Sequence, residues 1–210
     1  MAQVSGQVGI QTAADGVGTQ PFRQARTTEM VVTDAHGKYY ETVSRGNVYS
    51  QVVSGGAATA FTGGAAGTPL VSIYNPVGSG KNLVVLFVGV ASRVASTLAG
   101  TVGFNLWAGV SAANTGTATT PRNMLTLAQT GSVAISSSNA ATTGTTAINL
   151  VMPLGSYYWA TAAGAIIAPA FFDVAGAVVC APGNLVALGG TAALTTATYD
   201  VSMVWEEIAI

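Results

Sequence analysis

The stretch Thr198-Tyr-Asp-Val-Ser-Met-Val-Trp-Glu-Glu-Ile208 decides the fold, because apolar and polar side chains alternate along most of it. In an extended chain, successive side chains point to opposite sides, so such alternation predicts a β-strand with one buried face. The apolar set is Tyr199, Val201, Met203 and Trp205, and the opposite set is Asp200, Ser202 and Glu206.

Upstream of this strand, similar runs recur between clusters of Gly, Pro, Asn and Ser, the pattern of a sandwich or barrel. Two further apolar stripes are Val102, Phe104, Leu106 and Ile148, Leu150, Met152, Leu154. Residues 83–90 are apolar at nearly every position, which predicts a central strand covered on both sides. The predicted strands are 70–74, 82–93, 101–108, 131–136, 146–153, 165–172, 177–180, 185–188 and 198–208.

Helix signals are sparse. Residues 120–129 predict one short peripheral helix, because Thr120 can cap it and Pro121 can take its first position. Many short strands with little helix predict an all-β fold, a jelly-roll-like antiparallel β-sandwich with an extended N-terminal arm. An immunoglobulin-like sandwich is the alternative, weakened by the missing cysteine pair.

The N-terminal arm is predicted because charged residues and large side chains are unevenly distributed along the chain. Eight of the fifteen charged residues lie between Asp15 and Arg45, where residues 29–34 and 38–43 read as a short hairpin. Residues 54–67 are a low-complexity Gly/Ala stretch with too little side-chain bulk to pack a core. We therefore predict an extended arm with a short hairpin at 1–67, mobile up to about residue 25, and a β-sandwich domain at 68–210.

Composition narrows the possible functions. Charged residues make up 7% of the chain, against about 25% in ordinary soluble domains, so Thr and Ser hydroxyls or burial in an oligomer must keep the surface soluble. The net charge is −1 and no basic cluster occurs, which argues against nucleic-acid binding. The apolar stretch at 160–182 is interrupted by Pro169 and Asp173, so no membrane span is predicted. The first twelve residues lack the pattern of a secretory signal, so we expect no Sec export.

No motif in the chain predicts catalysis. The segment 75–82 resembles a phosphate-binding loop but lacks its first Gly and its Ser or Thr, so we expect a turn between strands. His36 is the single histidine and Cys180 the single cysteine, too few for a zinc site or a catalytic triad. We expect His36 in a solvated turn and Cys180 as a small buried hydrophobe. No catalytic, cofactor-binding or metal-binding residues are predicted, and no cofactor.

Two further groups leave alternatives open. Glu206 could form an acid/base pair with Asp200 or Glu207, although carboxylates on an outward strand face more often form a solvated edge or an interface contact. Tyr157, Tyr158 and Trp159 could form a sugar-stacking platform, and packing in the core or on a neighbouring subunit is the favoured interpretation.

Four segments resemble virion proteins of tailed bacteriophages. Residues 70–86 join an aliphatic strand, Asn-Pro, a Gly-Ser-Gly turn and a second aliphatic strand, as a recurrent motif of those proteins does. Residues 180–190 and 199–208 are similar to the last strands of jelly-roll capsid-decoration and spike domains, and residues 34–41 resemble the leader of the same proteins.

The resemblance implies a capsid decoration (cement) protein, commonly a homotrimer, that binds and stabilises the lattice of the major capsid protein. Its location would be the capsid surface of the virion, after synthesis in the host cytoplasm, and it would not be an enzyme. The alternatives are a tail, collar or receptor-binding spike protein of a phage, or a carbohydrate-binding β-sandwich module.

Overall fold

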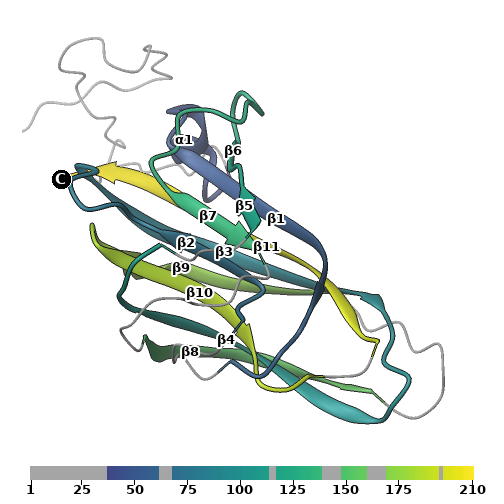
Figure 1. Ribbon diagram of the computed structural model, residues 1–210. Coiled ribbons are helices and arrows are strands. Elements are labelled where there is room, and N and C mark those ends of the chain that lie inside the picture. Colours follow the sequence, from purple (N-terminus) through teal and green to yellow (C-terminus); the bar gives the residue numbers. More distant parts are fainter. Residues whose placement is uncertain (1–36, 62–67, 114–116, 139–147, 160–168, 194–195) are drawn as a thin grey trace, which may run out of the picture. The chain divides into compact units, whose positions relative to one another are not determined.

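The computed structural model describes residues 37–61, 68–113, 117–138, 148–159, 169–193 and 196–210. The chain divides into two compact units, Met1–Glu41 and Thr42–Ile210. The second unit contains all the strands described below (Figure 1).

The described strands form two antiparallel sheets packed as a sandwich, so the predicted all-β sandwich is confirmed. The five-stranded sheet has the order β6 (Arg122–Asn123), β1 (Val48–Ala57), β11 (Thr198–Ala209), β3 (Lys81–Val94), β9 (Ala170–Cys180). The six-stranded sheet has the order β5 (Thr117–Thr119), β7 (Ile135–Ser138), β2 (Val71–Tyr74), β10 (Asn184–Gly190), β4 (Gly100–Val110), β8 (Asn149–Trp159). The jelly-roll connectivity in particular stays a prediction.

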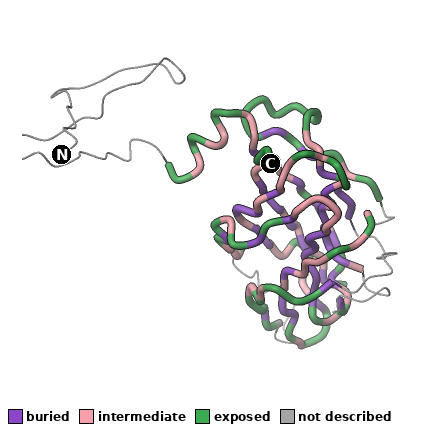
Figure 2. The backbone as a smooth tube through the Cα atoms, turned by 90° about the vertical axis from the view of Figure 1, so that its left-hand side faces the viewer, coloured by how far each residue is buried: buried purple, intermediate pink, exposed green. Residues whose placement is uncertain are grey.

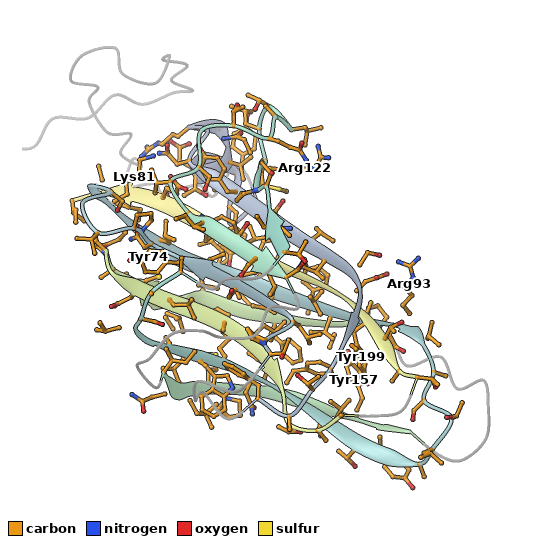
Figure 3. The ribbon with its side chains drawn as sticks, viewed as in Figure 1. Tyr74, Lys81, Arg93, Arg122, Tyr157 and Tyr199 are labelled. Atoms are coloured by element: carbon orange, nitrogen blue, oxygen red, sulfur yellow. The ribbon has the colours of Figure 1, made fainter. Side chains whose placement is uncertain are left out.

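The alternation in β11 is confirmed. Its four predicted core residues are each at most 1% exposed, while Asp200, Ser202 and Glu206 are half-buried on the opposite side. The predicted stripe of β4 is equally buried, and the ring of Phe104 lies edge-on to Tyr157 and Tyr199 at centroid distances of 5.6 and 5.1 Å. In Figure 2 buried residues gather in the middle of the second unit, and Figure 3 shows Tyr157 and Tyr199 close together.

The second predicted stripe, at residues 148–154, is wrong in half of its positions. Met152 and Leu154 pack against the core, but Leu150 is 48% exposed and Ile148 belongs to a separate cluster. The pairing of β4 with β8 shifts register between Leu106 and Trp107. A shift of one residue moves the following side chains to the other face of the sheet, which breaks the stripe.

The prediction of an arm is wrong for residues 48–57, which form β1 and pair with β11 along the strand. The Gly-rich end of β1 is accommodated by a register shift between Val53 and Gly56, where Gly55 adopts a φ of +72°. The large core side chains next to this segment come from its partner strand β11. Residues 1–36 and 62–67 of the predicted arm lie outside the described residues. The predicted first strand of the hairpin, the predicted mobile segment and His36 all fall within residues 1–36.

The prediction of a second hairpin strand at 38–43 is also wrong, because the helix α1 (Tyr40–Ser44) forms there. The amide of Tyr40 donates to the carbonyl of Gly37 at 2.9 Å, and Glu41 in the first turn suits the positive end of the helix. Gly46, with a φ of +74°, donates its amide to the Val43 carbonyl after the helix ends.

The helix predicted at 120–129 is absent. Arg122 and Asn123 form β6, which pairs with Ser50 and Tyr49 of β1. The Asn123 side-chain oxygen accepts from the amides of Leu125 at 2.9 Å and Thr126 at 3.1 Å, so the chain turns there. An Asn side chain that satisfies nearby amides offers the backbone an alternative to the helix.

The strands predicted at 165–172 and 177–180 are one strand, β9, interrupted by an irregularity at Ala175 and Gly176, whose φ values are +52° and +80°. Residues 165–168 lie outside the described part. β9 and β8 are edge strands, and β8 carries Pro153. A proline or a bulge blocks the pairing of a further strand at a sheet edge.

The remaining boundaries differ by a few residues. β7 begins at Ile135 where a strand was predicted from 131, β8 continues to Trp159, and β5 was not predicted. The turn at 75–82 is confirmed between β2 and β3, and the Asn75 side chain donates to the carbonyls of Lys81 at 2.7 Å and Cys180 at 2.8 Å.

Candidate interaction surface

A row of four residues crosses the outer face of the five-stranded sheet; it is apolar at both ends, with a serine and a glycine between them, and is called the apolar row. Val52 of β1 pairs with Ser202 of β11, Ser202 pairs with Gly89 of β3, and Gly89 pairs with Phe171 of β9. Residues directly opposite each other on neighbouring strands point to the same face. The two ends of the row protrude, since Val52 is 59% and Phe171 73% exposed.

A hollow of about 290 Å³ lies between these two ends. The residues that line it include Val52, Gly89, Ala91, Phe171, Asp200 and Ser202. Gly89 supplies part of the floor, because a Cβ at this position would lie 2.6 Å from the Ser202 hydroxyl and 3.7 Å from the Phe171 ring. The hollow therefore depends on a glycine that follows the bulky apolar residues 83–88 of β3.

A small polar network closes one end of the hollow. Asp200 accepts hydrogen bonds from the Ser54 hydroxyl at 2.8 Å and the Gly55 amide at 2.9 Å, and the Arg93 guanidinium lies 3.5 Å away. Arg93 also donates to the Ser54 hydroxyl. The hydrogen bond from Ser54, followed by that from Gly55 and the charge of Arg93, lowers the pKa of the Asp200 carboxyl. Its charge is thus satisfied by its own neighbours.

The outer face of the other sheet is partly covered by the chain that follows β1. Phe61 lies on Gly189 of β10, where a Cβ would come within 2.4 Å of the ring, and its amide donates to the Gly190 carbonyl at 2.9 Å. The Phe61 ring lies edge-on to Trp107 at 5.5 Å. Ile148, Leu185 and Ala187 complete this second apolar cluster. The corresponding faces of the two sheets therefore differ, and the apolar row of the five-stranded sheet is the more exposed.

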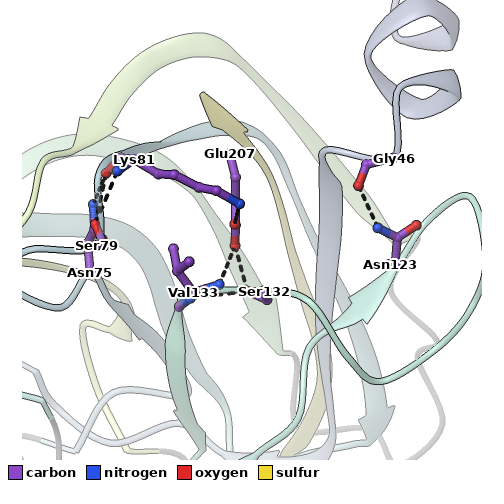
Figure 4. Close-up of polar contacts among 9 residues, drawn as sticks. Gly46, Asn75, Ser79, Lys81, Asn123, Ser132, Val133 and Glu207 are labelled. Carbon is purple, nitrogen blue, oxygen red and sulfur yellow. Dashed lines mark hydrogen bonds and ion pairs between the residues drawn. The ribbon is translucent and has the colours of Figure 1, made fainter. Parts of the chain in front are cut away.

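Glu207 is the residue whose position sequence reasoning missed. It was predicted on a solvated edge or in an acid/base pair, but its side chain is 0% exposed and points inward (Figure 4). Its carboxylate pairs with the Lys81 ammonium at 2.9 Å and accepts from the Ser132 hydroxyl at 2.6 Å and the Val133 amide at 3.0 Å. Asp200 and Glu206 are on the outward side of β11. The three carboxylates therefore do not form one acid/base cluster.

A second, polar hollow of about 290 Å³ lies beside β1, β5 and β6. It is lined by Ser50, Gln51, Val52, Thr119, Thr120, Arg122 and Gln129. Gln51 is 5% exposed, and its side-chain oxygen accepts from the Ser136 hydroxyl at 3.3 Å. Hydroxyl, amide and guanidinium groups together could donate to and accept from a small polar ligand.

The predicted aromatic cluster at 157–159 is split between the two faces of β8. Tyr157 is 9% exposed and donates its hydroxyl to the Val90 carbonyl at 3.1 Å, and burial raises its pKa. Tyr158 is 67% exposed. Core packing is thus confirmed for Tyr157, and Tyr157 and Tyr158 do not share a platform; the side chain of Trp159 lies outside the description.

Cys180 is buried and reduced, as expected for a small hydrophobe. Burial raises the pKa of its thiol to about 12. Within the described ranges, no three His, Cys, Asp or Glu side chains gather in a way that could hold a metal ion. The described helices include none with the length and apolar character to cross a membrane.

Comparison with models of known protein families, with curated proteins and with solved structures finds no match for this chain. The fold and the surface define its class, an antiparallel β-sandwich with an exposed apolar row on one sheet.

Proposed function

We propose that this chain is a virion structural protein, a capsid decoration protein that assembles with copies of itself and with the lattice of a major capsid protein. The observation that carries the proposal is the apolar row with its hollow on the five-stranded sheet. Large side chains that stay exposed in a continuous apolar surface mark sites of protein association. The low charged fraction, 7% of the chain, fits subunits whose surfaces become buried in a lattice.

The order of the long strands supports the jelly-roll connectivity that this proposal includes. When the eight long or central strands β1, β2, β3, β4, β8, β9, β10 and β11 are numbered one to eight, the sheets have the orders 1-8-3-6 and 2-7-4-5. Two nested Greek keys give this order, and jelly rolls with two Greek keys are a recurrent architecture of viral capsid domains.

The experiment that tests the proposal is the copy number of the protein in purified virus particles from the organism that encodes it. Quantitative mass spectrometry should give a stoichiometry comparable to that of the major capsid protein, and cryo-EM should place the sandwich on the shell. A few to a few dozen copies would assign the protein to the tail, collar or spike instead. Absence from particles would refute a virion role.

The polar hollow beside β5 favours a second candidate, a carbohydrate-binding module. Its lining offers the donors and acceptors that sugar hydroxyls need, but among the described residues it includes no aromatic ring. Screening of the purified protein on a glycan array tests this candidate, with Arg122→Ala as the variant expected to lose binding. Binding that Arg122→Ala leaves unchanged would place the ligand elsewhere.

A further inference from the structure

We propose that two copies of this chain pack face to face through the outer surface of the five-stranded sheet, with Phe171 of each copy in the hollow of the other. The inference rests on the proposed function, because it names the first partner of the apolar row. The proposed dimer has two-fold symmetry, unlike the predicted homotrimer, and it specifies the sheet face through which the copies bind.

The face is self-complementary. The Phe171 ring, 73% exposed, protrudes on the same face as the hollow that it borders. In a two-fold dimer the same surface patch of both copies meets. A protrusion and a hollow that lie side by side on one face therefore make two equivalent contacts, because each copy inserts its protrusion into the hollow of the other. The axis would lie in the interface plane, midway between the Phe171 ring and the hollow, above Gly89.

The available area is sufficient. The four long strands of the sheet, β1, β11, β3 and β9, are at least ten residues each. With strands about 4.8 Å apart and about 3.3 Å per residue, they cover roughly 19 by 35 Å, or about 700 Å². A standard stable interface buries about 600–1,000 Å² of each partner. One face reaches the lower part of this range when a single neighbour covers nearly all of it, which leaves no area for a second neighbour and favours a dimer over a three-fold ring.

The charges at the hollow do not oppose burial. Asp200 is the charged residue in its lining, and its carboxylate already pairs with Ser54, Gly55 and Arg93. Burying a charge is costly mainly when its partner is missing. Association would therefore bury no uncompensated charge in the row itself.

Association through two of the sheet edges, those formed by β8 and β9, is opposed by features of these strands. Pro153 of β8 has no amide to donate, and the Ala175-Gly176 irregularity bends β9. Both devices block addition of a strand from another molecule. The apolar row on the face is therefore a more favourable surface for the association of two copies than the edges at β8 and β9.

Sedimentation analysis of the full chain tests the oligomeric state. The wild type should sediment as a species of twice 20.9 kDa. Phe171→Asp should raise the dissociation constant of the dimer at least about 30-fold, the loss expected for a central anchor. Tyr158→Asp is the matched control, because Tyr158 is 67% exposed on the edge strand of the other sheet, and it should change the constant less than about 3-fold. A wild-type monomer at ~100 µM would overturn the proposal.

Photo-cross-linking identifies the occupant even if Phe171→Asp fails to fold. A benzophenone amino acid replaces Phe171 in the full chain, and isotopically light and heavy proteins are mixed before irradiation. We expect light-to-heavy cross-links to peptides that contain Val52 or Ser202. Cross-links within one molecule to residues 1–36, or between copies to the other sheet, would overturn the proposal.

The two tests separate this inference from the proposed function. A dimer through the apolar row in a protein absent from virus particles would refute the decoration role and leave the inference standing. A monomer that nevertheless decorates particles would refute the inference and assign the row to the capsid lattice.

Discussion

Replacement of Lys81 by Met should destabilise the sandwich, because it removes the cation from a fully buried carboxylate. The Glu207 side chain is 0% exposed and keeps only the Ser132 hydroxyl and the Val133 amide once the ammonium is gone. Breaking a fully buried ion pair costs about 3–5 kcal/mol. Lys81 is 31% exposed, so solvent screens the pair, and we expect a loss of about 2–3 kcal/mol. For a unit of this size the midpoint of thermal unfolding should fall by about 4–12 °C.

Chemical and thermal unfolding at one fixed protein concentration measure this loss, because self-association would otherwise shift the midpoint. The matched control is Arg93→Met. The Arg93–Asp200 pair spans 3.5 Å between side chains that are 54% and 43% exposed, so its removal should cost less than about 1 kcal/mol.

The double variant Lys81→Met with Glu207→Gln should recover at least half of the loss, because it leaves no buried charge and the amide oxygen can still accept both hydrogen bonds. A Lys81→Met protein within about 0.5 kcal/mol of the wild type would refute the reasoning. A double variant less stable than Lys81→Met alone would do so as well.

Three further outcomes are expected. Gly189→Ala should cost about 1–3 kcal/mol in denaturant unfolding, because its Cβ would lie 2.4 Å from the Phe61 ring; wild-type stability would contradict this. NMR titration should place the pKa of Asp200 below its ordinary value of 3.8, and Ser54→Ala should raise it. The stability that Asp200 contributes is then present above the unfolded-state pKa and is lost as the pH falls through the lower folded-state pKa; an unchanged pKa in the variant contradicts the assignment. Cys180, whose pKa is raised to about 12, should react with a thiol reagent at pH 8 only as the protein unfolds, and rapid reaction of the native protein would contradict its burial.

Two controls accompany these measurements. Gly37→Ala adds a methyl group that meets no atom within 4 Å, so it should leave the free energy of unfolding unchanged. Thr126→Ala alters an exposed turn distant in sequence from Asp200 and should leave the Asp200 titration unchanged.

The sequence was most informative where a strand buries one face. The alternation of β11 and β4 predicted their core residues correctly, because the period of two is a direct consequence of extended backbone. Glu207 continues the stripe of buried odd-numbered residues in β11, but its negative charge predicted a solvent-exposed side chain. Its burial depends on Lys81, which is 126 positions away in the chain, and such a pairing cannot be inferred from local pattern.

The errors have a common physical cause, since tertiary partners override local preference. The Gly/Ala-rich end of β1, residues 54–57, contains too little bulk for a core strand on its own, and it is extended because β11 pairs with it. Residues 120–129 match a helix start, but the Asn123 side chain bonds the following amides and turns the chain. The apolar row takes one residue from each of four strands, so it could be recognised only once the register of those strands was known.

The position of β11 between β1 and β3 also determines when the protein can fold. β1 otherwise pairs only with the two residues of β6 among the described strands, so the backbone groups that pair with β11 stay open until residues 198–209 are available. A ribosome that adds about 5–20 residues each second needs roughly 8–30 s to proceed from β1 to the end of β11. During that time the nascent strands are exposed to chaperones and to neighbouring chains, and the sandwich closes in one late step.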